Sequence, residues 1–507
     1  MIGGVHALLA RAAEITPGAT AFELEGQAWS YAEVERAAAS AAVDLLAQGV
    51  GPGERVAVLA ENGPEFLVWT FAIARLGAVV QPLNTRLAVP ELEGALALCR
   101  TKVVLHTEHF AELAASLGAP SREICVRGLE LGPSAPPQPV AADDMAFLYT
   151  TSGTTGRPKG VVLTHNNVVQ HALSACIELE LTAADTWAHI APMFHLADAW
   201  ATLALTLVGA RHVFLPSFEA GAALDLFEVE RVTLTNLVPT MLGDMVRHET
   251  AAVRSFPALR LLLSGGAPIA PTVVRQVMEV FRAEYVQTYG MTETSPYLTL
   301  SRLAPEHAKL AVEEQFALRA RTGRPFLGVE LQVVDEAGEP VPADDATVGE
   351  IRVRGASVTP GYYEDAEATA AAIREGWLYT GDLARVDRHG FVEIVDRKKD
   401  MILSGGENIY STEVEAVLHA HPSVAEVAVF GRPDEHWGER VTAAIVPGGS
   451  AEAGVGLEQD LSAFCRSRLA AYKTPKEGHF MEALPRTGTG KISKRALRSG
   501  LESKDRS

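Results

Sequence analysis

The chain has 507 residues, 48% of them hydrophobic and 21% charged, with a formal net charge of −19. This length exceeds what one hydrophobic core organises and predicts at least two domains. The negative charge argues against a nucleic-acid partner, because binding a phosphate backbone needs a basic face, whereas an ATP site needs only local positive charge.

Cysteine usage and hydropathy predict a cytoplasmic protein. Cys99, Cys125, Cys176 and Cys465 are scattered without metal-type spacing, as expected for buried thiols in a reducing compartment. The first 14 residues lack the basic start and continuous apolar core of a signal peptide. No apolar run reaches the roughly 18 residues that would predict a membrane-spanning helix.

Strands and helices alternate over the first part of the chain. Apolar residues over 5–13 lie on one helical face, and Ser30 is placed to cap a helix that runs to about Gly49. There follow a strand, a helix and two further strands, at 55–59, 64–76, 79–82 and 103–106. This alternation predicts a parallel sheet with helices on both faces.

The pattern changes further along the chain. Residues 120–142, rich in proline and small residues, predict a surface connection before the alternation resumes. From Gly328, strand-like segments separated by turn residues predict a small antiparallel or barrel-like subdomain. Beyond Asp396, helices and strands predict a compact α+β unit.

We therefore expect an α/β protein in three parts. These are an N-terminal domain of parallel sheets flanked by helices with a barrel-like subdomain (1–395), a hinge (396–400) and a small mobile C-terminal domain (401–507).

The most informative stretch is Thr-Ser-Gly-Thr-Thr-Gly-Arg-Pro-Lys-Gly, residues 151–160, which follows an apolar strand. Its glycines allow consecutive backbone N–H groups to turn toward one point, and its hydroxyl and basic side chains add donors and positive charge. It is not a P-loop, because the Gly-Lys-Ser/Thr ending is absent. The stretch predicts a loop that binds phosphates.

Further motifs carry side chains suited to a nucleotide. Tyr289-Gly-Met-Thr-Glu-Thr combines an aromatic ring that can stack on adenine with a carboxylate suited to Mg²⁺. Ser-Gly-Gly-Ala-Pro at 264–268 follows an apolar strand, where open α/β folds bind ligands. The remaining motifs are Tyr-Thr-Gly-Asp at 379–382, Asp-Arg-Lys-Lys-Asp at 396–400 and Pro-Arg-Thr-Gly-Thr-Gly-Lys at 485–491.

Together, and in this order, these motifs resemble those of the adenylate-forming superfamily, which includes acyl-CoA synthetases, luciferases and the adenylation domains of peptide synthetases. Bacterial fatty-acyl-CoA synthetases are the nearest group. The resemblance implies an AMP-forming acid–thiol ligase. A carboxylic acid and Mg²⁺-ATP give acyl-AMP and pyrophosphate, and coenzyme A then displaces AMP.

The resemblance also implies that the N-terminal domain binds ATP and the acyl group, that the C-terminal domain acts as a lid, and that individual residues have the following roles. Lys491 bridges the attacking carboxylate and the α-phosphate, Glu293 binds Mg²⁺, and Thr151 and His195 complete the catalytic set. Asp382 and Arg397 grip the ribose. The full set of implied ATP and AMP contacts is Thr151, Ser152, Gly153, Thr154, Thr155, Gly156, Lys159, Gly266, Ala267, Tyr289, Gly290, Met291, Thr292, Asp382, Arg397 and Lys491.

Three features of the C-terminal part follow from the same resemblance. Lys399 is the expected hinge, and Gly405 and Gly406 lie beside the tunnel for the pantetheine arm of coenzyme A. Ser411 stands where relatives usually carry proline, and we expect it to cap the next helix. Acetylation of Lys491 would remove its charge and is a hypothesis for regulation.

The predicted acyl pocket contains His195, Asp198, Trp200, Val238 and Gly266. His195 stands about where amino-acid-activating domains carry the aspartate that holds the ammonium group, which disfavours amino acids. Asp198 is either paired and turned away or reads a polar group on the substrate, because an unpaired buried carboxylate costs several kcal/mol. We favour a fatty or short branched acid and leave aryl acids open.

Other interpretations remain open from the sequence. The acyl group could pass to a carrier protein instead of free coenzyme A, although no carrier domain is attached. A luciferase-like oxidoreductase shares the same motifs. The expected partners are a small-molecule carboxylic acid, ATP and coenzyme A, with no nucleic acid and no membrane span, and a homodimer is left open.

Overall fold

The computed structural model describes residues 3–24, 26–118, 122–125, 132–151, 158–449, 453–486 and 492–505. The chain divides into two compact units. The first comprises Met1–Leu331, Arg352–Tyr379 and Gly390–Val392, and the second comprises Gln332–Ile351, Thr380–His389 and Glu393–Ser507. The hinge predicted at 396–400 falls inside the second of these units and stays a prediction.

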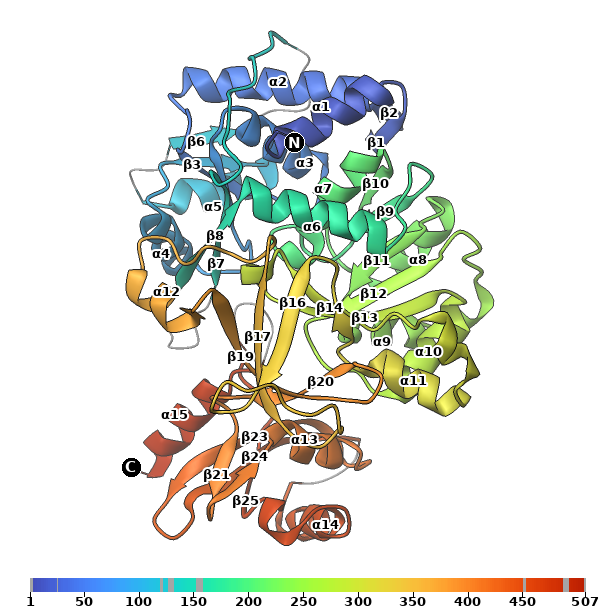
Figure 1. Ribbon diagram of the computed structural model, residues 1–507, viewed down its shortest axis with the longest axis vertical. Helices are drawn as coiled ribbons and strands as arrows, with labels where there is room; N and C mark the ends of the chain where they lie inside the picture. The colour runs from blue at the N-terminus through green and yellow to red at the C-terminus, as the bar shows by residue number, and fades with distance from the viewer. Residues whose placement is uncertain are drawn as a thin grey trace. The chain divides into compact units, whose positions relative to one another are not determined.

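The first unit contains a six-stranded sheet of order β6-β5-β3-β4-β7-β8 (Figure 1). Neighbouring strands are parallel except β7 and β8, which are antiparallel. The bounds are β3 (Arg55–Leu59), β4 (Val79–Pro82), β5 (Val103–His106), β6 (Arg122–Cys125), β7 (Met145–Thr151) and β8 (Lys159–Thr164). The predicted parallel sheet is confirmed, but β6 lies where the sequence predicted only a connection.

A second sheet of the first unit has seven strands in the order β10-β9-β11-β12-β13-β14-β15. Its strands are parallel from β10 to β13, and β14 and β15 add antiparallel pairs. The bounds are β9 (Thr186–His189), β10 (Arg211–Phe214), β11 (Leu234–Leu237), β12 (Leu261–Gly265), β13 (Glu284–Gly290), β14 (Tyr297–Leu300) and β15 (Arg324–Pro325).

A hairpin of β1 (Thr20–Leu24) and β2 (Gln27–Ser30) lies beside β10 of the second sheet (Figure 1). The first unit also contains twelve α-helices among its described residues, and most of them pack on the two sheets. They are α1 (His6–Ile15), α2 (Tyr31–Ala47), α3 (Pro64–Arg75), α4 (Val89–Cys99), α5 (Ala111–Ser116), α6 (His165–Glu178), α7 (Leu196–Val208), α8 (Ala220–Val229), α9 (Pro239–Arg247), α10 (Pro271–Phe281), α11 (Val312–Ala320) and α12 (Ala366–Ala372). Ser30 caps α2 in a capping box with Glu33, as predicted.

One hydrophobic core joins the two sheets of the first unit. It contains Val58 and Tyr149 from the six-stranded sheet and Leu263 from the seven-stranded sheet. Helix α7 is buried along almost its whole length, and its polar residues Asp198, Thr202 and Thr206 are buried as well. The core therefore fixes α7, which begins directly after His195.

A five-stranded sheet has the order β16-β17-β19-β18, with β20 beside β19, and its strands include residues of both units. Its bounds are β16 (Val329–Val334), β17 (Gly349–Gly355), β18 (Ile373–Arg374), β19 (Trp377–Val386) and β20 (Val392–Arg397). This sheet corresponds to the predicted barrel-like subdomain.

The second unit also has its own five-stranded sheet, of order β22-β21-β24-β23 with β25 beside β24. Alternate residues of β23 enter two cores, one shared with α13 and α14 and the other with α15. The bounds are β21 (Ile402–Ser404), β22 (Glu407–Ile409), β23 (Val424–Asp434), β24 (Gly438–Pro447), β25 (Glu477–Phe480), α13 (Ser411–His419), α14 (Val455–Arg466) and α15 (Lys494–Asp505). The predicted α+β fold is confirmed.

Within the described part of the chain, no helix has both the length and the apolar character needed to cross a bilayer.

Candidate active site

The predicted site residues of the first unit gather at the carboxyl ends of the seven-stranded sheet. His195 follows β9, Val238 follows β11, Gly266 and Ala267 follow β12, and Glu293 follows β13. Open α/β sheets bind ligands at this edge, where loops from neighbouring strands converge. The structure therefore brings together residues that are far apart in the sequence.

The loop after β12 presents bare backbone. Gly266 has a φ of +82°, a conformation that favours glycine because a side chain would be strained there. A methyl group built on Gly266 would lie 4.0 Å from Val238 Cγ1, and Val238 is 37% exposed. Gln287 Nε2 donates to the Ala267 carbonyl at 2.9 Å. The arrangement forms an open wall with a fixed backbone.

The turn after β13 holds Glu293 in place. A Cβ on Gly290 would lie 1.9 Å from the Pro296 carbonyl oxygen, so only glycine fits this close approach. Glu293 is 7% exposed, and its Oε1 accepts a hydrogen bond of 2.9 Å from the Tyr362 hydroxyl. Thr359 N–H donates to the Glu293 carbonyl at 2.8 Å.

Tyr362 links Glu293 to the phosphate-loop motif. Lys159 Nζ lies 4.5 Å from the centroid of the Tyr362 ring, within the range of a cation–π contact. Burial, and then the nearby Glu293 carboxylate, raise the pKa of the Tyr362 hydroxyl, which keeps it protonated as a donor. Sequence reasoning missed Tyr362, and the only available signal was an aromatic pair after Pro360-Gly361.

Strands β7 and β8 form the base of the phosphate-loop motif. Thr151 pairs with Lys159 across these strands, so the segment between them starts and ends at one place. Ser152, Gly153, Thr154, Thr155, Gly156 and Lys491 lie outside the described residues, and their predicted roles stay predictions.

The residues present fit a Mg²⁺–nucleotide site. Mg²⁺ uses one or two protein carboxylates and takes its other ligands from phosphates and water, and Glu293 would supply one such carboxylate at the carboxyl end of β13. No cluster of three or more carboxylate, histidine or cysteine ligands occurs among the described residues, which is compatible with an ion held largely by phosphates.

Asp198 and Trp200 are both buried on α7. Asp198 Oδ2 lies 2.5 Å from His189 Nδ1, and Trp187 Nε1 donates to Asp198 Oδ1 at 3.3 Å. The geometry favours the paired alternative for this carboxylate. Trp200 packs edge-on against Trp187 and Tyr297 and donates from Nε1 to the Ala197 carbonyl.

In the second unit, Asp382 and Arg397 come together as a pair. Arg397 Nε lies 3.2 Å from Asp382 Oδ1, with the carboxylate buried and the guanidinium side chain 50% exposed. Lys398 N–H donates to the Gly381 carbonyl at 2.9 Å, which aligns the two motifs. A buried carboxylate beside an accessible guanidinium is suited to holding a diol.

Ser411 differs from the expectation. It is the first residue of α13, and the cap position is Tyr410, which makes no side-chain cap bond. Instead, Ser411 N–H donates to Asp396 Oδ2 at 2.5 Å and Lys494 Nζ donates to Ser411 Oγ at 2.5 Å. Lys494 also pairs with Glu415 at 2.8 Å. The predicted cap is wrong because Ser411 lies one residue inside the helix.

Gly405 and Gly406 form the two-residue turn between β21 and β22, with φ values of +62° and +84°. Positive φ at both positions is the requirement of a tight hairpin turn. A Cβ on Gly405 would lie 3.0 Å from the Trp437 ring. The predicted hinge residue, Lys399, lies two positions after Arg397 in the sequence. Burial lowers the pKa of its ammonium group.

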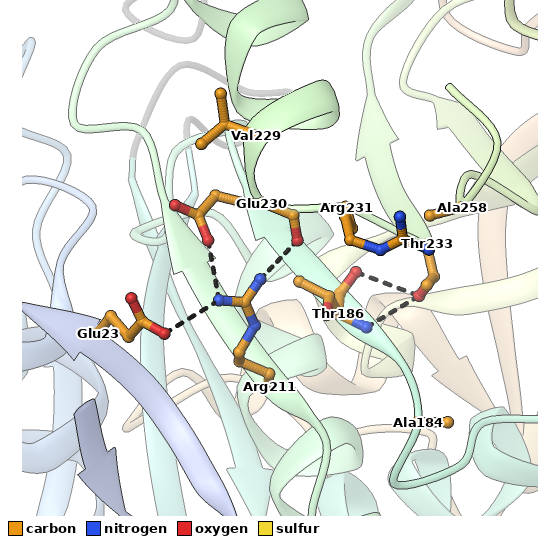
Figure 2. Close-up of a pocket in the computed structure, with 9 residues that line it drawn as sticks. All are labelled: Glu23, Ala184, Thr186, Arg211, Val229, Glu230, Arg231, Thr233 and Ala258. Atoms are coloured by element: carbon orange, nitrogen blue, oxygen red, sulfur yellow. Dashed lines mark hydrogen bonds and ion pairs between the residues drawn. The ribbon is translucent and has the colours of Figure 1, made fainter. Parts of the chain in front are cut away.

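A pocket of about 530 Å³ lies elsewhere, at the amino ends of the seven-stranded sheet (Figure 2). Arg211 there pairs with Glu230 at 2.8 Å and with Glu23 at 3.6 Å. Its polar side chains are largely committed to one another, and none of the predicted site residues lines it. We therefore do not assign catalysis to this pocket.

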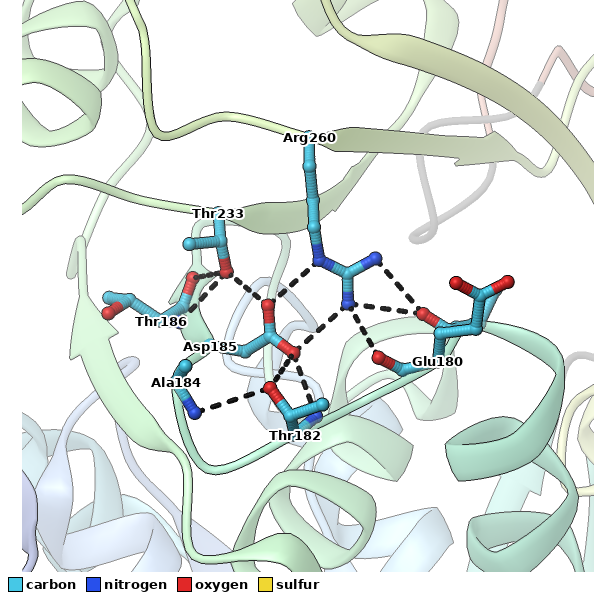
Figure 3. A network of polar contacts seen from close by, with 8 residues as sticks. Glu180, Thr182, Ala184, Asp185, Thr186, Thr233 and Arg260 are labelled. Carbon is cyan, nitrogen blue, oxygen red and sulfur yellow. Dashed lines mark hydrogen bonds and ion pairs between the residues drawn. The ribbon is translucent and has the colours of Figure 1, made fainter.

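An ion-pair network also lies at these amino ends (Figure 3). Arg260 donates to both oxygens of Asp185 at 2.9 and 3.0 Å, and Thr233 Oγ1 donates to Asp185 Oδ1 at 2.9 Å. Burial would raise the pKa of Asp185, but bonds from Arg260, Thr182 and Thr233 outweigh it and the pKa is lowered.

Comparison with known proteins places this geometry in a family. Residues 9–363 match the family described as AMP-binding enzyme, and residues 413–491 match its C-terminal domain. Feruloyl-CoA synthase from Amycolatopsis sp is 41% identical over 493 residues, covering 96% of this chain and 97% of the relative. Indoleacetate–CoA ligase from Aromatoleum aromaticum is 36% identical over 508 residues, with 96% of each chain covered.

Two solved structures of one enzyme are similar to this chain over nearly its whole length. The o-succinylbenzoate CoA synthetase MenE from Bacillus subtilis, in complex with its acyl-adenylate intermediate, is 31% identical with a TM-score of 0.85, covering 98% of this chain and 97% of that one. The same enzyme in complex with ATP and magnesium ion also has a TM-score of 0.85, at 31% identity, covering 98% of this chain and 99% of that one.

The fold and site define an adenylate-forming enzyme. The chain belongs to the AMP-binding enzyme family. The sequence-based assignment to this family and to the AMP-forming acid–thiol ligases is confirmed at that level.

Proposed function

We propose that this enzyme is an ATP-dependent CoA ligase for an aromatic carboxylic acid. The observation that carries the proposal is the identity of 41% and 36%, over nearly the whole chain, with relatives named for ferulate and indoleacetate. We favour an aromatic acid over the fatty or short branched acid that the sequence favoured, because these two relatives are named for aromatic acids.

The open wall at the carboxyl ends of the sheet supports a flat substrate. Gly266, with Val238 beside it, presents an exposed surface without bulky side chains. His195 lies at the start of α7, half-buried and edge-on to Phe194. We assign the acid's ring to this wall and its carboxylate to the side of the wall that carries His195.

In the first half-reaction, a carboxylate oxygen attacks the α-phosphorus and the bond to the pyrophosphate oxygen breaks. Attack of one anion on another needs positive charge where charge accumulates, and Lys491 would supply it. Glu293 would hold Mg²⁺, which neutralises phosphate charge when bound. Asp382 and Arg397 would fix the ribose, and Tyr289 the adenine.

In the second half-reaction, the thiol sulfur of coenzyme A attacks the acyl carbon. The C–S bond forms, the bond to AMP breaks, and the thiol proton is released to solvent. Gly405 and Gly406 would leave room for the pantetheine arm. We place the reaction in the cytoplasm, where ATP and coenzyme A are available, and a homodimer stays a prediction.

The test is CoA-dependent AMP release with a panel of aromatic, straight-chain and branched acids. We expect turnover with ferulate- or indoleacetate-like acids at kcat/KM at least tenfold above that with alkanoates. Turnover with straight-chain acids alone would overturn the aromatic assignment. Pyrophosphate exchange without AMP release on adding CoA would point to a carrier-protein acceptor, and oxygen consumption to a luciferase-like oxidation.

Two substitutions separate the half-reactions. Lys491→Ala should abolish adenylate formation yet still convert supplied acyl-adenylate to thioester, because the lysine acts only on the first step. Lys399→Pro should spare adenylate formation and block thioester formation, because a stiffened hinge prevents domain closure. Equal loss of both steps in both variants would contradict the separation.

A further inference from the structure

One side chain holds the segment that carries His195. Asn62 follows β3 and is 5% exposed. Its Nδ2 donates to the carbonyls of His189, Ala191 and Leu215 at 3.1, 3.0 and 3.2 Å, and its Oδ1 accepts from Met193 N–H at 2.8 Å. Asn62 thus ties the end of the six-stranded sheet to the loop that leaves β9.

The ends of this segment are joined through their side chains. His189 Nδ1 lies 2.5 Å from Asp198 Oδ2, and both side chains are inaccessible to solvent. His189 Nε2 lies 3.0 Å from His212 Nδ1, and His212 Nε2 lies 3.3 Å from Thr206 Oγ1. The ten residues from His189 to Asp198 therefore form a closed loop.

These contacts form a continuous chain of polar groups from Thr206 Oγ1 through His212 and His189 to the Asp198 carboxylate, in which every imidazole nitrogen has a partner. Burial, and then the neighbouring His189, hold the pKa of His212 well below its usual range. Neither histidine is accessible for chemistry, so the network is structural.

His195 lies inside the closed loop. Its carbonyl accepts from Asp198 N–H and Ala199 N–H, both at 3.0 Å, and its own N–H donates to the Pro192 carbonyl at 2.9 Å. The backbone around the imidazole is therefore fixed from both sides, whereas the side chain remains half-buried at the ligand-binding edge.

We propose that Asn62 is a positioning residue that acts through His195. It never touches the reacting atoms, but it holds the loop so that the imidazole meets the substrate without an ordering cost during the reaction. This inference rests on the proposed function, because it takes His195 to contact the acid, and it adds a residue from a different sheet to that site.

The experiment is a double-substitution cycle between Asn62 and His195. Asn62→Asp keeps the volume and the acceptor for Met193 but removes three donor contacts, and Asn62→Ala removes all four. Each should lower kcat/KM for the acid by at least about tenfold, on the scale of a misplaced catalytic group. In a His195→Ala background, the same Asn62 substitutions should lower kcat/KM by less than about twofold, because the imidazole that Asn62 positions is no longer present.

Gln81→Glu is the matched control. Gln81 is also fully buried, and its amide donates to the Ala95 carbonyl at 3.1 Å and accepts from Thr101, but it contacts nothing in the His195 loop. Its substitution should lower the melting temperature and leave kcat/KM per folded molecule unchanged. If the Asn62 variants behave like this control, or lose the same factor with and without His195, the inference is wrong.

The result of the Asn62–His195 cycle can be interpreted even if the proposed substrate or acceptor is wrong. The cycle can be measured by pyrophosphate exchange with any acid that supports adenylation, whether or not coenzyme A is the acceptor. An aliphatic preference would therefore overturn the aromatic assignment and leave the Asn62 cycle informative.

Discussion

Strand β13 has a carboxylate near each end, and the two have different surroundings. Glu284, at its amino end, faces Arg302 at 3.7 Å and Arg319 at 3.6 Å. Glu293, just beyond its carboxyl end, accepts from the Tyr362 hydroxyl beside an exposed glycine turn. At the amino end of β13 the carboxylate forms ion pairs with arginines of the same protein. Beyond the carboxyl end, the carboxylate lies beside exposed glycine backbone.

The rest of the sheet repeats this contrast. At the amino ends, the pairs Asp185–Arg260 and Arg211–Glu230 bind strands and loops together. At the carboxyl ends, Glu293 is held by the Tyr362 hydroxyl, and the backbone at Gly266 and Gly290 is exposed. A sheet can thus be stabilised at one edge and used for chemistry at the other.

The largest expected effect is a difference in adenylate formation between substitutions of Glu293 and of Glu284. Glu293→Gln should lower adenylate formation by about 10²-fold or more, because the carboxylate that would hold the metal is lost. Glu284→Gln should leave the rate within about twofold. Pyrophosphate exchange measures both, and similar losses in the two variants would contradict the assignment of the edges.

The next effect is on stability. Arg260→Leu leaves the buried Asp185 carboxylate without its cation and should lower the free energy of unfolding by about 3 kcal/mol. Turnover per folded molecule should not change. Urea unfolding together with active-site titration checks both parts, and a loss of turnover without a loss of stability would assign this network to the chemistry.

The pH dependence of that stability follows from the pKa of Asp185. Because its folded-state pKa is lowered, its contribution is present above the unfolded value of about 3.9 and is lost as pH falls through the folded value. The stability difference between the wild type and Asp185→Asn should be constant from pH 7 to 5 and shrink below about pH 4. Unfolding midpoints across this range measure it.

The smallest effect concerns the wall of the acyl site. Gly266→Ala and Gly390→Ala both place a side chain at positive φ, +82° and +77°, and each should cost about 1 kcal/mol of stability. Only Gly266→Ala should raise KM for the acid, by about three- to fivefold, because a Cβ added at Gly390 would meet no atom within 4 Å and Gly390 lies outside the site. Equal KM values in the two variants would show that Gly266 does not line the acyl site.

The sequence predicted the fold well where patterns are local. Alternating strands and helices and the Ser30 cap each depend on a few neighbouring residues. Strand β6 was missed because its four residues lie within a segment whose proline-rich composition predicts a connection, and its pairing with β5 depends on tertiary structure.

The candidate site was predictable only where residues belong to motifs. Glu293, Asp382 and Arg397 come from such motifs, and the structure places Arg397 Nε 3.2 Å from Asp382 Oδ1. Tyr362 and Asn62 carry no motif, because their roles come from hydrogen bonds to segments about 70 and 130 residues away. Spacing along the chain cannot reveal such contacts.

The bond from Ser411 to Asp396 couples the two positions energetically. A proline at 411 has no N–H to donate, so it would leave Asp396, whose pKa burial raises, without that partner. The effect of substituting either residue therefore depends on the identity of the other. A chimaera joined between 396 and 411 would inherit the two halves of this bond from different parents, and its behaviour would depend on whether they match.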